Sequence, residues 1–183
     1  GYEDFSYLST DVFKGSTKSI YIYPEWGDTR YSEGYAVFID WNNDGDFDDA
    51  DETALTRTPT SANSISGSIT VPANASIASV RMRVILQNYA NPIACGSFDH
   101  GQVEDYTLNI INDIIAPTNP ANLTASQTTN TKTKLTWTAA TDNVAVTKYV
   151  IYKNGVEISN VPANTLTLEV TGLTKNTNYD FYV

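Results

Sequence analysis

The sequence predicts an all-β protein made of two tandem β-sandwich domains. Short segments in which apolar and polar residues alternate support this prediction, because such alternation is typical of strands with one buried face. These segments end at Gly, Pro, Asn or Asp, and none keeps the 3.6-residue period of a helix. Pro117 and Pro120 interrupt the strand-like pattern, so we expect a stiff linker over residues 113–120.

The first domain is expected over residues 1–112. Its predicted strands cover residues 19–23, 35–40, 65–71, 80–86 and 106–111. In the segment 80–86 the apolar residues at even positions share one face, and Arg81 and Arg83 lie on the other. We therefore expect strands that are buried on one face only.

The charge of the chain is concentrated in this first domain. The 183 residues carry 21 acidic and 11 basic side chains and a formal net charge of −10. An acidic protein repels nucleic acids and anionic membranes, and no apolar run approaches the roughly 20 residues of a membrane helix. One Cys and one His exclude a scaffold of several disulfides and a thiolate zinc site. We expect a neutral or cationic partner, with no nucleic acid and no membrane insertion.

Seven acidic residues fall within positions 40–52, directly after a predicted strand. Residues 40–51 fit the pattern D-x-N-x-D-G-x-x-D-x-x-D, whose regularly spaced oxygens converge on one ion. Gly45, at the sixth position, allows the sharp turn of such a loop. Hard oxygen ligands favour calcium, so the sequence predicts a Ca²⁺ site. The predicted ligands are the side chains of Asp40, Asn42, Asp44, Asp48 and Asp51 and the backbone carbonyl of Asp46.

Two alternatives to this calcium site stay open. In the first, the acidic segment is a solvated turn that binds no metal. In the second, the ion not only stabilises the loop but also contacts a molecule that the protein binds. Stabilisation alone is favoured, because the loop can fill the coordination shell by itself.

The second domain is expected over residues 121–183. Its predicted strands cover residues 122–126, 134–138, 148–153, 156–159, 165–170 and 179–183. Trp137 lies in the second of these strands, and Leu173 precedes Tyr179 by six residues, as in the tyrosine corner of immunoglobulin-like sandwiches. On these residues, the segment 116–183 resembles a fibronectin type III domain. That family has one further closing strand, so we expect a truncated domain or a partner that covers the open edge.

Several short motifs mark the first domain. One reads Gly101-Gln102-Val103-Glu104-Asp105, preceded by Cys95-Gly96 and followed by Tyr106, and an early segment reads Gly1-Tyr2-Glu3-Asp4-Phe5. Together with the segments 35–41 and 81–84, they resemble the GEVED domain, named for a Gly-Glu-Val-Glu-Asp motif. The resemblance implies a module of a large secreted or surface-attached bacterial protein. Such modules accompany proteases, glycan-active enzymes or adhesin-like repeats, often with a sorting domain for type IX secretion.

The same resemblance bears on the cysteine. Members of the family often carry a second Cys upstream of the early signature, and the present chain begins after that position. Cys95 is then either a buried apolar residue or half of a disulfide whose partner lies outside this chain.

Asp4, Glu104 and Asp105 are the remaining carboxylates of these motifs. If their two segments are neighbouring strands, the three acids build a second cation site or accept hydrogen bonds from Arg81 and Arg83. The salt-bridge alternative is favoured.

Aromatic residues on predicted loops are candidates for ligand binding. Trp26 and Tyr89 lie on such loops, where their rings can stack on a sugar face. Tyr21, Tyr23 and Tyr35 alternate along predicted strands, which favours packing in the core or in cross-strand pairs.

Three functions are weighed on this basis. The favoured one is a non-catalytic, calcium-stabilised accessory module of a secreted or cell-surface bacterial protein, which binds polysaccharide or a surface protein. The alternative is a structural spacer that positions a neighbouring catalytic or adhesin domain. A hydrolase comes third. Two carboxylates suffice for glycoside hydrolysis, but a nucleophilic triad would depend on His100, with no Gly-x-Ser-x-Gly elbow.

Overall fold

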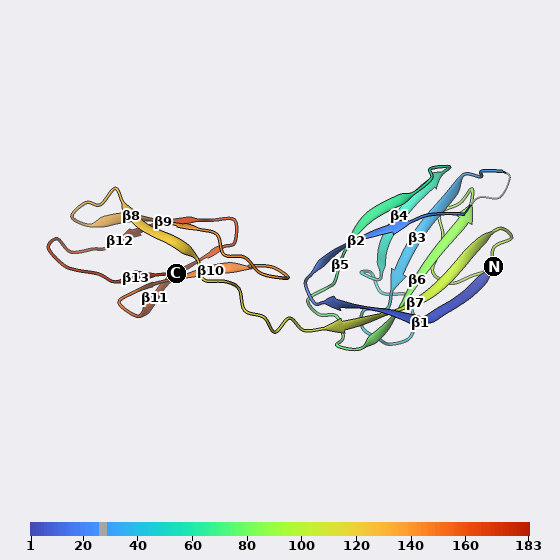
Figure 1. Cartoon of the computed structure of the whole chain (residues 1–183), viewed down its shortest axis with the longest axis horizontal. Helices are drawn as coiled ribbons and strands as arrows, with labels where there is room; N and C mark the ends of the chain where they lie inside the picture. Colours follow the sequence, from blue (N-terminus) through green and yellow to red (C-terminus); the bar gives the residue numbers. More distant parts are fainter. Residues whose placement is uncertain (26–28) are drawn as a thin grey trace. The chain divides into compact units, whose positions relative to one another are not determined.

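The computed structural model describes residues 1–25 and 29–183. In these ranges the helices and strands assigned are strands only, β1 to β13, and this confirms the predicted all-β fold. The chain divides into two compact units, Gly1–Asp113 and Ile114–Val183 (Figure 1). In the described part of the chain, no helix has the length and apolar character needed to cross a membrane.

The first unit contains one large sheet and one small sheet. The large sheet has the strand order β1-β7-β6-β3-β4, and the small sheet pairs β2 with β5. The strands are β1 (Tyr2–Phe13), β2 (Thr17–Ile22), β3 (Glu33–Ile39), β4 (Thr53–Thr60), β5 (Ile65–Thr70), β6 (Ser79–Asn88) and β7 (Gly101–Ile111). β1 runs parallel to β7, and the other neighbours are antiparallel.

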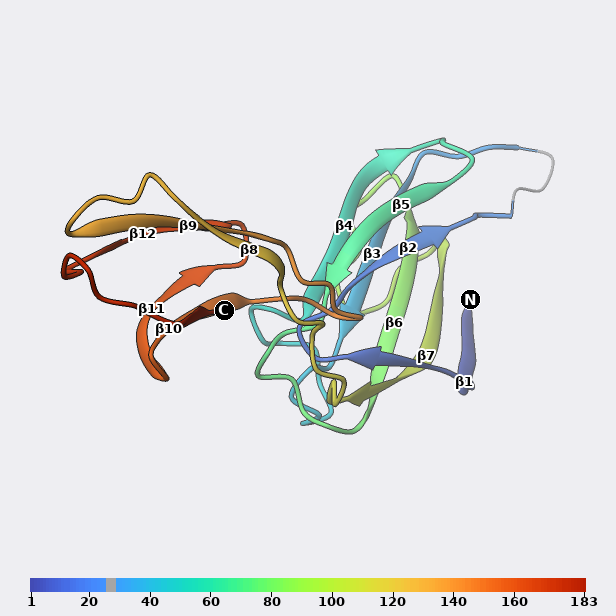
Figure 2. The ribbon, with the colours of Figure 1, turned by 60° about the vertical axis from the view of Figure 1, so that its left-hand side comes forward.

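The main core of this unit lies between the two sheets. Figure 2 shows β2 and β5 lying across one face of the large sheet. Val37, Val80 and Ile110 of the large sheet and Ile69 of β5 belong to one buried cluster. Ile20 of β2 packs against the same cluster. The small sheet therefore shields the apolar face that the alternation in residues 80–86 predicts.

The opposite face of the large sheet is also covered. Phe38 of β3 and Ile85 of β6 are buried there, together with Phe47 of the loop that follows β3. Every residue of β3 is buried in consequence. The expectation of strands buried on one face only is therefore wrong for the centre of this sheet, because its connecting loops fold back over the second face.

The second unit is a sandwich of two three-stranded sheets, ordered β11-β10-β13 and β12-β9-β8. The strands are β8 (Ala121–Ser126), β9 (Lys132–Thr138), β10 (Lys148–Lys153), β11 (Val156–Pro162), β12 (Thr167–Thr171) and β13 (Phe181–Tyr182). Trp137 and Leu135 form its core with Tyr149, Ile151 and Val170. The backbone N–H of Thr174 donates to the hydroxyl of Tyr179 at 3.0 Å, as expected of a tyrosine corner.

Some predicted strand limits differ from those in the structure. The last strand was expected over residues 179–183, but only Phe181–Tyr182 pair with β10. Tyr179 forms the tyrosine-corner hydrogen bond and does not pair with β10, so the strand begins only at Phe181. β1 and β4 were not predicted as strands.

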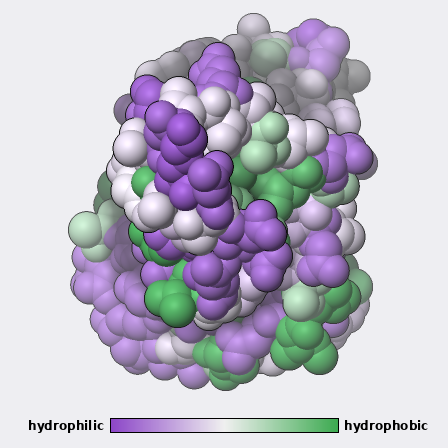
Figure 3. All heavy atoms as spheres, turned by 90° about the vertical axis from the view of Figure 1, so that its left-hand side faces the viewer, coloured by the Kyte–Doolittle hydropathy of each residue, from purple (hydrophilic) through white to green (hydrophobic). Residues whose placement is uncertain are grey.

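The surface of the molecule is mainly polar on the side drawn in Figure 3. Hydrophilic side chains are in the majority there, and the apolar ones form several separate groups.

Candidate functional site

The acidic loop joins β3 to β4 and begins where β3 ends. Asp40 is 4% exposed, and its backbone N–H donates to the carbonyl of Arg81 at 3.1 Å. The backbone N–H groups of Asp44 and Gly45 donate to its two carboxylate oxygens at 3.1 and 3.0 Å. Gly45 has a φ of 100°, a conformation that a residue with a Cβ adopts only with strain. The loop therefore turns sharply around the Asp40 side chain.

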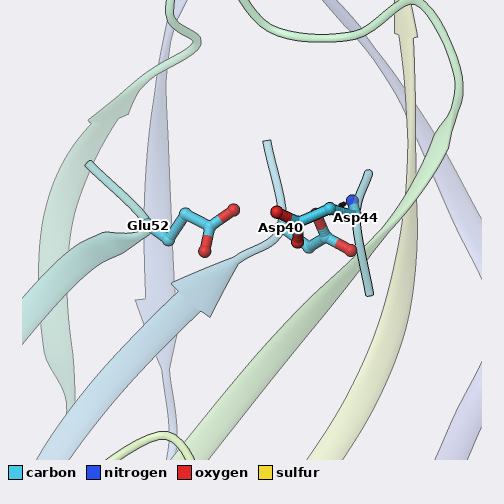
Figure 4. A group of neighbouring side chains, drawn as sticks. All are labelled: Asp40, Asp44 and Glu52. Atoms are coloured by element: carbon cyan, nitrogen blue, oxygen red, sulfur yellow. Dashed lines mark hydrogen bonds between the residues drawn. The ribbon is translucent and has the colours of Figure 1, made fainter. Parts of the chain in front are cut away.

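Three carboxylates meet inside this turn. Asp40, Asp44 and Glu52 each offer an oxygen, and these oxygens lie within 4.8 Å of one another. Figure 4 shows the Glu52 side chain extending toward Asp40 from the start of β4. Glu52 is fully buried, and burial, followed by repulsion from the neighbouring aspartates, raises its pKa. Two of the three carboxylates, Asp40 and Glu52, are thus buried, whereas Asp44 is exposed.

Backbone hydrogen bonds fix Glu52 in this position. Its Oε1 accepts from the N–H of Trp41 at 3.1 Å, and its Oε2 accepts from the N–H of Asp49 at 3.2 Å. The indole N–H of Trp41 donates to the carbonyl of Asp51 at 3.1 Å. Glu52 was not among the predicted ligands, although it is one of the seven clustered acids. No local signal indicated its burial, because β4, which begins at the next residue, was not predicted as a strand.

The other predicted ligands form hydrogen bonds within the loop or are exposed. Asn42 donates from Nδ2 to carboxylate oxygens of Asp44 and Asp49, at 2.7 and 2.6 Å. Asp46 accepts from the backbone N–H of Asp48 at 2.9 Å. The side chains of Asp48 and Asp51 are exposed. Of the residues that the sequence predicts, the structure brings Asp40 and Asp44 together and adds Glu52.

Phe47 attaches the loop to the sheet. It is 7% exposed, and its ring centre lies 6.2 Å from that of Phe38. The guanidinium of Arg83 lies 5.1 Å from the centre of the same ring. An apolar side chain inside the acidic segment therefore docks the loop on the outer face of β3 and β6.

The acids of the Gly101–Asp105 motif have other partners. Asp105 is 2% exposed and accepts two hydrogen bonds of 2.7 Å, from Nε and Nη2 of Arg83. Arg81 lies farther away, at 3.9 Å. Asp4 is paired in register with Asp105, and hydrogen bonds from Ser6 lower its pKa. The two motifs are thus on neighbouring strands, and Asp105 forms a buried ion pair with Arg83.

A groove of about 850 Å³ opens beside the main core. It is lined by residues of β1, β2, β3, β6 and β7 and of the segment that follows β2. Glu104 of β7 lies opposite Val84 in register and four positions from the core residue Leu108, so it shares the inner face of the sheet. In the groove, this face therefore presents Glu104 next to apolar side chains such as Val84 and Leu86.

Tyrosines and carboxylates dominate the groove. Tyr21, Tyr23 and Tyr31 are 60%, 69% and 43% exposed. Glu104 accepts from the Tyr106 hydroxyl at 2.7 Å and from Gln102 at 3.0 Å. Burial, and next the hydrogen bond to Glu104, raises the pKa of Tyr106 to about 12.

The remaining candidates lie elsewhere. Trp26 lies outside the described residues. Tyr89 is 69% exposed, with a φ of 57°, and does not line the groove. Cys95 is an exposed free cysteine, so the expectation of a buried apolar residue is wrong.

Comparison with known proteins supports the two-domain organisation. The family model of the GEVED domain matches residues 34–109, and that of the fibronectin type III domain matches residues 117–183. These matches confirm the two resemblances and their order along the chain.

Each of the curated relatives matches about a third of the chain or slightly more. Chitinase Chi52 of Paenibacillus xylanexedens is 46% identical over 39% of this chain and 13% of its own length. Chitinase D of Niallia circulans is 51% identical over 34% of this chain and 12% of its own length. Exoglucanase A of Cellulomonas fimi is 48% identical over 32% of this chain and 7% of its own length. The match is thus a small part of each relative. The chain contains a GEVED domain, matched over residues 34–109, followed by a fibronectin type III domain, matched over residues 117–183.

Proposed function

We propose that the chain is a non-catalytic, calcium-stabilised accessory module of a secreted bacterial polysaccharide-active protein. In this proposal, the groove of the first domain binds glycan at a surface, and the second domain joins it to neighbouring domains. Support comes from the relatives, which are named as chitinases and an exoglucanase and share only a small part of their length with this chain.

The observation that carries the proposal is the combination of exposed tyrosines with polar groups in one groove. Tyr21 and Tyr23 offer rings on which the apolar face of a sugar can stack. Gln102 and Glu104 lie beside them in the groove and form hydrogen bonds of the type that orient sugar hydroxyls.

Calcium has a separate role in the proposal, as a stabiliser of the acidic loop. Asp40 and Glu52 are buried beside Asp44, and their charges repel one another without a cation. The cluster offers only oxygen ligands, which suit calcium better than zinc or copper. The carbonyls and water that complete a calcium shell are available from so exposed a loop.

Binding assays on the whole chain test the glycan part. The chain should be retained by insoluble polysaccharide, and Tyr21→Ala with Tyr23→Ala should weaken retention at least tenfold, because each stacked ring contributes to affinity. Tyr7→Ala, which removes a 76% exposed ring outside the groove, is the matched control. Tyr89→Ala tests the other candidate, the loop that the sequence predicts to bind ligand. Loss of retention in this variant would place binding at that loop instead of the groove. If no polysaccharide retains the chain, the proposal of a recognition module is wrong and the alternative of a structural spacer takes its place.

Thermal unfolding with calcium and with chelator tests the metal. Calcium should raise the melting temperature of the first domain by several degrees, because it binds the folded loop only. Asp44→Asn should abolish this increase and leave the melting temperature in chelator nearly unchanged. Glu157→Gln, an exposed charge change in the second domain, should keep the increase. Equal melting of the native chain in calcium and in chelator would remove calcium from the proposal.

A further inference from the structure

We propose that the groove binds a polysaccharide that carries free amino groups, such as a partly deacetylated chain of glucosamine units. This inference rests on the proposed glycan-binding function and names its ligand class. It comes from the charge of the groove, from two polar side chains that lack adequate partners, and from the exposed tyrosines.

The charge of the groove has one sign. Glu3, Glu25, Glu33 and Glu104 line it, and its described lining contains no Lys and no Arg. A neutral sugar would leave this charge uncompensated, and an anionic one would be repelled. A ligand with ammonium groups would be attracted by the carboxylates and by the faces of the exposed tyrosines.

Two side chains in the groove need a hydrogen-bond donor. Glu33 is only 8% exposed, and in the described structure its carboxylate accepts a single long hydrogen bond, of 3.4 Å, from the hydroxyl of Tyr35. The side-chain oxygen of Asn88 is buried and has no partner among the described residues. These two residues are paired in register on β3 and β6 and both line the groove. Unmet acceptors side by side favour a ligand rich in N–H and O–H donors.

The carboxylates of the groove differ from those of the acidic loop. Among the described residues, the only group of three converging acidic side chains is that of Asp40, Asp44 and Glu52, outside the groove. Glu3 and Glu104 are register partners on β1 and β7, and Gln102 donates to both, at 3.3 and 3.0 Å. Two neighbouring carboxylates attract an ammonium group, which is smaller in charge than the divalent ion that a group of three would hold.

The tyrosines favour a sugar chain over a basic peptide. Tyr21, Tyr23 and Tyr31 border the groove and are 60%, 69% and 43% exposed, so their rings are accessible to a ligand. Exposed rings beside polar groups can stack on flat sugar rings, which a lysine-rich peptide lacks.

Calorimetric titration of the calcium-loaded whole chain tests the inference. The probes are the glucosamine hexamer, the N-acetylglucosamine hexamer and cellohexaose, with a lysine hexapeptide as the basic control. We expect the glucosamine hexamer to bind at least tenfold more tightly than both neutral sugars and the peptide. Its affinity should also fall as salt rises, because salt screens charge pairs.

Variants locate the binding in the groove. Glu3→Gln with Glu104→Gln should remove the preference for the glucosamine hexamer over its acetylated form, whereas Glu157→Gln should keep it. Glu25→Gln, at an exposed position, should reduce the preference severalfold even if the double variant fails to fold.

The outcomes separate the two proposals. Equal binding of both hexamers would overturn the inference and leave the glycan-binding function in place. Tighter binding of the lysine peptide would replace the polysaccharide with a basic protein as the ligand. Absence of binding to every sugar would overturn both proposals.

Discussion

Arg83 connects three parts of the first domain through one side chain. It forms the two-fold hydrogen-bonded pair with Asp105, and its Nη1 donates to the carbonyl of Ala94 at 3.1 Å. Its guanidinium also lies 5.1 Å from the ring centre of Phe47. The GEVED motif, the loop after β6 and the acidic loop therefore depend on the same residue.

Removal of Arg83 should be costly for this reason. We expect Arg83→Ala to lower the free energy of unfolding by about 3–5 kcal/mol, because it leaves the buried Asp105 carboxylate without its partner. Lys132→Ala breaks a pair whose side chains are 46% and 53% exposed, and should cost less than about 1 kcal/mol. Urea denaturation of the two variants measures both values, and similar losses would contradict a special role for Arg83.

Glu33 should make the first domain sensitive to pH. Burial raises its pKa above the ordinary 4.5, so the folded state keeps a proton that the unfolded state has lost. Stability should therefore fall as pH rises from 4.5 through the folded-state pKa. Glu33→Gln should remove this fall and be more stable than the native chain at neutral pH.

Thermal unfolding in chelator, from about pH 4 to pH 8, measures the difference between the two proteins. They should melt alike at the acidic end, where Glu33 is protonated in both states. A constant difference across the range would show that Glu33 does not titrate as expected.

The acidic loop and the groove differ in how far the sequence predicts them. Asp40 and Asp44 follow from the spacing of one continuous segment, since turns place nearby residues together. Glu52 joins them only because β4 begins there and buries it. The groove brings Glu3 beside Glu104, 101 positions apart in the sequence, so no local pattern predicts it.

The strands show the same limit. β3 and β6 were predicted as strands because their apolar residues either alternate with polar ones or follow one another without interruption. β1 has nine exposed residues among its twelve, so it lacks the buried face on which periodicity depends. β4 contains Pro59 and four threonines, and its position at the sheet edge accommodates the proline. Pairing with β7 and β3, respectively, makes strands of these segments.

The loop between β3 and β4 should depend on its one buried aromatic residue. We expect Phe47→Ala to lower stability by about 3–5 kcal/mol, because it removes a buried ring from the outer face of the sheet. It should also weaken calcium binding, since the loop loses its attachment. Calcium titration and urea denaturation measure the two effects, with Tyr7→Ala as the exposed control. Unchanged calcium affinity would mean that the turn around Asp40 forms without Phe47.

Across the whole molecule, each unit has its own core and should unfold as a separate transition. Calorimetry of the full chain should show two transitions, of which calcium raises only that of the first unit. Ile151 is fully buried in the second unit. Ile151→Ala should therefore destabilise only the second unit, by about 2–5 kcal/mol in its free energy of unfolding. A single transition that both changes shift would contradict independent unfolding.

The parallel pairing of β1 with β7 has a mechanical consequence. These are the first and last strands of the GEVED unit, and eight residues of β1 from Tyr2 to Phe13 are in register with partners from Val103 to Ile111. Because the strands run in the same direction, tension applied to the two ends of the unit pulls them along their length in opposite directions. The inter-strand hydrogen bonds are then loaded in shear and share the force, instead of opening one after another. Such a geometry makes the unit resist force that is applied through its two ends.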